Sequence, residues 1–198
     1  MALEGLTKDN LVELFLQSDL STINKLCSLN KQLNELCNDE NLWQQKYIAA
    51  FGPRLVQVKS WKHAYQLRVN PKIPFVAKWS KLDENNSKTD EIIETDCVID
   101  LSRTKINFDR DENDFGHKSL IVIASMRIKV CGNETAPMEI KDDDYFVESV
   151  KEAMRPYFNN LDDLEYDHLF YRDHQNKNYL VYNIGQKLVV EILDLCRD

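Results

Sequence analysis

Two histidines near the end of the 198-residue chain each follow an aspartate, as Asp167-His168 and Asp173-His174. Imidazole and carboxylate groups bind metals and move protons in catalysis. Residues six positions apart on a strand face the same side, so the two histidines could share a site. The surrounding polar and aromatic residues are equally typical of an exposed strand and turn, and zinc sites use shorter spacings. We therefore predict no metal here.

Two groups of acids resemble cation sites only in their composition. Asp142–Asp144 precede an amphipathic segment, where the positive end of a helix dipole favours negative charge, so we expect them to begin a helix. The second group is an acidic loop whose composition could suit Ca²⁺, formed by Asp109, Asp111, Glu112 and Asp114. This stretch lacks the glycine and final glutamate of an EF-hand loop, and we expect it to be solvated.

The remaining signals of catalysis are missing from the sequence. A phosphate-binding loop needs closely spaced glycines, whereas Gly116, Gly132 and Gly185 stand alone. A cysteine nucleophile needs a nearby histidine and an activating environment, and the sequence supplies a signal for neither. We predict that the protein is not an enzyme and uses no cofactor, with an unrecognised enzyme as an alternative.

The composition is that of a globular protein, with 43% hydrophobic and 29% charged residues. No apolar run approaches the roughly 20 residues of a membrane helix, and the opening MALEGLTKDN does not read as a secretory signal. The five cysteines are an odd, widely spaced set without a CxxC motif: Cys27, Cys37, Cys97, Cys131 and Cys196. We expect Cys27 and Cys37 to be reduced and buried in helices, which favours the cytoplasm or nucleus.

The charge is divided unevenly along the chain. Residues 1–72 carry 9 Lys and Arg against 7 Asp and Glu, whereas residues 73–198 carry 16 against 26, which together give the net charge of -8. Such a split favours two units, and Asn70-Pro71 marks the boundary, so we predict domains at 1–70 and 71–198. The acidic second half makes a nucleic-acid partner unfavourable, because phosphates repel it.

The first fifty residues have the pattern of three helices separated by caps. Thr7 can cap a helix over 8–17, and Ser21 can cap a long helix that continues to Cys37. Asn38-Asp39 begins a third helix that ends at Gly52-Pro53, because glycine adopts the left-handed cap conformation and proline cannot continue a helix. None of these helices is stable alone, so they must pack into a bundle.

This stretch, LTKDNLVELFLQSDLSTINKLCSLNKQLNELCNDENLWQQKYIAAFG, resembles the F-box family. The residues that carry the resemblance are Leu6, Asp9, Leu14, Leu20, Ile23, Leu26, Leu29, Asn30, Lys31, Leu33, Leu36, Leu42, Trp43, Lys46 and Tyr47. It covers about a quarter of the chain. Thr7 stands where the family has proline, and Asn10 where it has leucine. Compact chains of this kind also resemble F-box-like proteins of large DNA viruses, which would imply a host–virus interaction.

The resemblance implies binding to the Skp1 adaptor of a cullin ubiquitin ligase, while the C-terminal half captures a second protein. The implied partner-binding residues are Leu6, Thr7, Asn10, Leu11, Leu14, Leu42 and Trp43. A structural homo-oligomer that no longer binds Skp1 is the alternative, because the departures at Thr7 and Asn10 fall on the adaptor-binding segment.

A further helical stretch, 56–68, carries basic residues and precedes the boundary. It reads either as a basic surface for a partner or as the solvated face of a packed helix. Beyond the boundary, strands are predicted at 73–79, 97–101, 120–130, 168–171 and 179–182, with an amphipathic helix over 145–158. Residues 187–195 fit either a strand or a helix. The predicted fold class is therefore α+β: an F-box-like three-helix bundle followed by a mostly antiparallel sheet with one or two helices.

Overall fold

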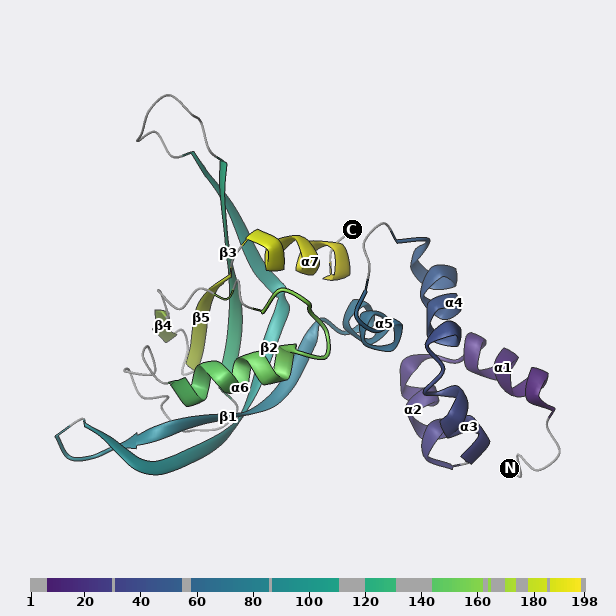
Figure 1. The fold of residues 1–198 in the computed structure, drawn as a ribbon, viewed down its shortest axis with the longest axis horizontal. Coiled ribbons are helices and arrows are strands. Elements are labelled where there is room, and N and C mark those ends of the chain that lie inside the picture. Colours follow the sequence, from purple (N-terminus) through teal and green to yellow (C-terminus); the bar gives the residue numbers. More distant parts are fainter. Residues whose placement is uncertain are drawn as a thin grey trace. The chain divides into compact units, whose positions relative to one another are not determined.

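A computed structural model shows two compact units, Met1–Asn70 and Pro71–Asp198, each with its own core. The first is helical and the second combines a sheet with helices, so the predicted α+β class is confirmed (Figure 1). The structure describes residues 7–29, 31–54, 58–85, 87–110, 120–130, 144–161, 164, 170–173, 178–184 and 186–196. Leu6, Asp111, Glu112, Asp114, Cys131, Asp142, Asp143, Asp167, His168 and His174 lie outside them. Of the two acidic groups, Asp144 is described as the first residue of a helix, as expected, whereas Asp109 belongs to a strand rather than to a loop.

Described residues of the first unit form helices α1 (Lys8–Gln17), α2 (Leu20–Leu29), α3 (Lys31–Leu36), α4 (Glu40–Phe51) and α5 (Trp61–Val69). The side chain of Thr7 accepts a hydrogen bond from the Asn10 amide and begins α1, as predicted. Asp39 caps α4 in the same way, and Gly52, at a φ of 84°, ends it. Local sequence signals therefore fix both ends of α4 and the start of α1.

The long helix predicted between Ser21 and Cys37 is wrong, because two helices occupy this stretch. Cys27 and Cys37 have Cα atoms 6.0 Å apart, whereas ten residues of one straight helix would separate them by about 15 Å. The predicted cap is also misplaced. The Asp19 carboxylate, rather than Ser21, accepts a hydrogen bond from the Thr22 amide, at 2.7 Å, at the start of α2.

The last helix of this unit, α5, begins at Trp61 rather than at the predicted Val56, with Ser60 as its cap. A cluster of aromatic rings joins α5 to α1 and α4. Trp43 packs edge-on against Phe15, with ring centroids 4.9 Å apart, and its other neighbour is Tyr65 of α5, at 5.6 Å. This cluster forms the centre of the helical core, and α4 contributes its tryptophan to it.

The second unit is built on a five-stranded antiparallel sheet in the order β1-β2-β3-β5-β4. Its strands are β1 (Lys72–Leu82), β2 (Lys88–Arg110), β3 (Leu120–Val130), β4 (Phe170–Asp173) and β5 (Asn178–Ile184). β3 has the bounds that its β-branched run predicted. β2 is far longer than the predicted 97–101, because it pairs with β1 along one edge and β3 along the other, with a register shift after Asp100.

Two helices of this unit contact the sheet (Figure 1). Helix α6 (Asp144–Met154) packs on β1, where Phe146 lies against Trp79, with ring centroids 6.1 Å apart. Helix α7 (Gln186–Cys196) packs on β2 and β3, which decides the open alternative for 187–195 in favour of a helix. The predicted helix 145–158 ends earlier, at Met154, although Phe158 is buried.

Candidate partner-binding site in the helical unit

A groove of about 320 Å³ lies between α1 and α3. It is lined by Lys8, Leu11, Gln32, Glu35, Leu36 and Asp39. Its apolar part consists of Leu11 and Leu36. Both side chains are buried, with exposed fractions of 3% and 7%. Lys8 and Glu35 are exposed, so a cation on α1 and an anion on α3 border the groove. Four of the six lining residues are polar or charged, so the groove is a mainly polar surface with two leucines at its base.

The residues that the F-box resemblance implied for partner binding do not all lie on one surface. Thr7 and Asn10 are exposed at the start of α1, and Leu14 is partly exposed on the same helix. Leu11 lines the groove. Leu42 and Trp43 are buried in the core, with Trp43 only 1% exposed. Of these residues only Leu11 lines the groove, and the Leu42-Trp43 pair packs inside the helical core instead.

The second wall of the groove was not predicted. Gln32, Glu35 and Leu36 belong to α3, whereas the sequence pattern predicted α2 and α3 as one long helix. A continuous helix shows the same apolar spacing as two consecutive short ones, so periodicity alone contains no signal for this wall.

Lys46 connects the end of α1 to α4. Its ammonium donates hydrogen bonds to the carbonyl oxygens of Phe15, Leu16 and Ser18, at 3.2, 2.9 and 2.6 Å. These carbonyls lie at the end of a helix, where the backbone has no further amide to satisfy them, and a cation there also favours the helix dipole. The same ammonium lies 5.3 Å from the Tyr65 ring centroid. A buried lysine thus fixes the position of the helix that forms one groove wall.

The buried environment of Lys46 disfavours the charged form of its ammonium group. Burial lowers the pKa of the lysine below its usual 10.5, and the nearby Asp19 carboxylate partly opposes that shift. Burial also raises the pKa of Tyr65 above 10.0. A sequence signal for Lys46 existed, because it lies three residues after Trp43 and four after Leu42, on the buried side of α4.

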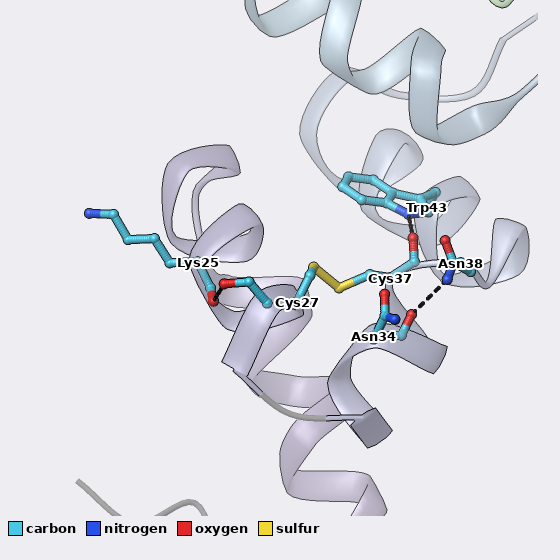
Figure 2. Close-up of a disulfide and its surroundings, with 7 residues drawn as sticks. Lys25, Cys27, Asn34, Cys37, Asn38 and Trp43 are labelled. Carbon is cyan, nitrogen blue, oxygen red and sulfur yellow. Dashed lines mark hydrogen bonds between the residues drawn. A yellow bond between two sulfur atoms is a disulfide. The ribbon is translucent and has the colours of Figure 1, made fainter.

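The structure contains a disulfide between Cys27 and Cys37, so the expectation that both cysteines are reduced is wrong (Figure 2). Cys27 belongs to α2, whereas Cys37 directly follows α3. The pairing was missed because a straight helix through this stretch would keep the two sulfurs apart. The carbonyl oxygen of Cys37 accepts a hydrogen bond of 2.9 Å from the Trp43 indole Nε1.

Two features are absent from the described part of the chain. No group of three His, Cys, Asp or Glu side chains within it could hold a metal ion. None of the helices among the described residues has both the length and the apolar character needed to cross a bilayer. The feature that these residues do provide is the groove between α1 and α3.

Comparisons with known proteins add no relative. No protein-family model matches the chain, and no curated protein or solved structure is significantly similar to it.

Proposed function

We propose that the protein is an interaction adaptor whose helical unit engages a Skp1-like partner through the α1 face and the groove beside it. The observation that carries the proposal is the position of Leu11. This residue belongs to the segment in which the F-box resemblance places adaptor contacts, and it lines a groove whose other wall is α3. The exposed Thr7 and Asn10 lie on the same helix and extend that surface.

The second part of the proposal concerns the α+β unit, which would capture a target protein and so bring it to a cullin ubiquitin ligase. Its first two strands expose apolar side chains, with Val76 47% exposed and Ile92 44% exposed. Exposed apolar side chains are common in protein–protein interfaces, where their removal from water favours binding. The two units would then bind two different proteins.

Size-exclusion chromatography with light scattering, on the chain alone and with purified Skp1, tests the first part. The proposal predicts a stable one-to-one complex. Reversing either exposed charge of the groove, by Lys8→Glu or Glu35→Lys, should weaken it about tenfold, because a like charge then faces the partner's complementary group. Glu152→Lys makes the same charge change as Glu35→Lys, on an exposed residue of α6, and serves as the matched control for that variant.

Two results would contradict the proposal. A chain that forms a large homo-oligomer and ignores Skp1 is a scaffold rather than an adaptor. A complex that tolerates Lys8→Glu and Glu35→Lys as well as Glu152→Lys does not use the groove. The second result leaves adaptor binding intact and moves its surface elsewhere.

A further inference from the structure

We infer that the Cys27–Cys37 disulfide is a redox-sensitive latch that holds α3 in place and thereby maintains one wall of the α1–α3 groove. A thiol reductant would open the latch and release α3, and reoxidation would restore it. The consequence for binding rests on the function proposed above, whereas the order of α3 can be measured without any partner.

Helix α3 depends on its surroundings for stability. It has six residues, Lys31–Leu36, which is far below the length of about 12–15 residues at which helices become marginally stable alone in water. Only Leu33 and Leu36 are buried, and its other four side chains are exposed. The disulfide attaches the end of this short helix to α2 and closes a loop with a sequence separation of 10. Removing that constraint increases the freedom of the segment that it encloses.

The two sulfurs differ in their surroundings, which sets the direction of the exchange (Figure 2). Cys37 is 3% exposed, and its carbonyl is hydrogen-bonded to the buried Trp43. Cys27, in α2, is only partly buried. Since thiol–disulfide exchange depends on access to the attacked sulfur, an external thiolate reaches Cys27 first.

The step is balanced with a dithiol as the reductant. One thiolate of the dithiol attacks Cys27 Sγ, the bond between the two sulfurs breaks, and Cys37 leaves as a thiolate that takes up a proton. The second thiol of the dithiol then displaces Cys27 from the mixed disulfide. Two electrons and two protons pass to the protein, and the dithiol ends as a cyclic disulfide.

Hydrogen–deuterium exchange read by mass spectrometry, on the full chain before and after dithiothreitol, tests the latch. We expect amides of α3 to exchange at least about tenfold faster in the reduced chain, while those of α4 change little. Removal of the dithiol with air oxidation should restore the slow exchange. Alkylation before and after reduction, followed by peptide mapping, reports whether Cys27 and Cys37 carry free thiols.

Three outcomes would overturn the latch: α3 exchange that is equal in both states, a bond that the dithiol cannot open in the folded chain, or free thiols at Cys27 and Cys37 before reduction. The double variant Cys27→Ser, Cys37→Ser should resemble the reduced chain and ignore the dithiol. If that variant does not fold, reduction and reoxidation of the wild-type chain still decide the question.

Skp1 affinity measured in both redox states tests the coupling to binding. We expect the reduced chain to bind at least about tenfold more weakly, because one groove wall is no longer held. Absence of binding in both states contradicts the proposed function, and the latch is then judged on exchange alone. Equal affinity in both states, with faster α3 exchange in the reduced one, contradicts the coupling between the latch and the groove.

Discussion

The ammonium nitrogen of Lys46 lies 2.6 Å from the carbonyl oxygen of Ser18, and this contact joins α4 to the turn that ends α1. Together with the bonds to Phe15 and Leu16, it satisfies carbonyls that the helix itself cannot. The position of α1, and so of the groove wall that contains Leu11, depends on a charged group inside the core.

Replacing Lys46 with methionine should lower the free energy of unfolding by about 2–4 kcal/mol. Methionine keeps an apolar chain of similar length, but it leaves three carbonyls without their donor; one of those bonds is buried and the other two are partly buried. Urea unfolding followed by circular dichroism measures the change. Lys31→Met, at an exposed position, is the matched control and should be nearly neutral. A Lys46→Met variant as stable as the control would remove this contact from the supports of α1.

The cap of α2 predicts an acid-dependent stability. The backbone amide of Thr22 donates to the Asp19 carboxylate and lowers the pKa of that carboxyl below 3.8. Between the two pKa values the unfolded chain binds a proton that the folded chain does not. The carboxylate therefore stabilises the fold above pH 3.8, and this contribution is lost as the pH falls through the lowered folded-state pKa.

Asp19→Asn tests this dependence, because asparagine can still cap a helix but does not titrate. Thermal unfolding of both proteins at about pH 6 and about pH 3 should show the wild-type advantage shrinking on acidification. All other acids titrate in both proteins, so the difference between them isolates Asp19. An advantage that stays constant between the two pH values would contradict the role of its charge.

The core position of Trp43 can be separated from its hydrogen bond. Trp43→Phe keeps a ring in the cluster but leaves the Cys37 carbonyl without its donor, which should cost about 1–3 kcal/mol. Combined truncation, Leu42→Ala with Trp43→Ala, should disrupt the unit, because each buried truncation costs about 2–5 kcal/mol. Ile48→Ala, on the same helix and 40% exposed, is the control. Unchanged melting of the double variant would show that these residues are not part of the core.

In the α+β unit, Glu191 connects α7 to the segment that follows α6. Its carboxylate accepts a hydrogen bond of 2.8 Å from the Asn159 amide and another from the Asn160 side chain. Glu191→Ala removes both and should destabilise this unit by about 1–3 kcal/mol, measured by urea unfolding. Val190→Ala, next to it and 50% exposed, is the control. Equal stability of the two variants would contradict the connection.

Local signals in the sequence determined the elements whose ends are set within a few residues. Helix α1 begins after Thr7 and α4 begins after Asp39, because each side chain caps the adjacent turn; α4 ends at Gly52 because of its positive φ angle. All three positions were predicted. The β-branched run of β3 fixed that strand for the same local reason. The mixture of helical and strand periods determined the α+β class. The F-box resemblance of the first quarter stays a prediction.

Tertiary structure decided the features that depend on residues distant in sequence or on a change of direction. The break between α2 and α3 leaves the apolar spacing intact, so only the closeness of Cys27 and Cys37 reveals it. The length of β2 follows from its two neighbouring strands, and the carbonyls that Lys46 binds lie about thirty positions earlier in the chain. The groove combines both kinds of information. The helix that forms its α1 wall was predicted from the local spacing of apolar residues. Its α3 wall exists because the chain turns back on itself after α2.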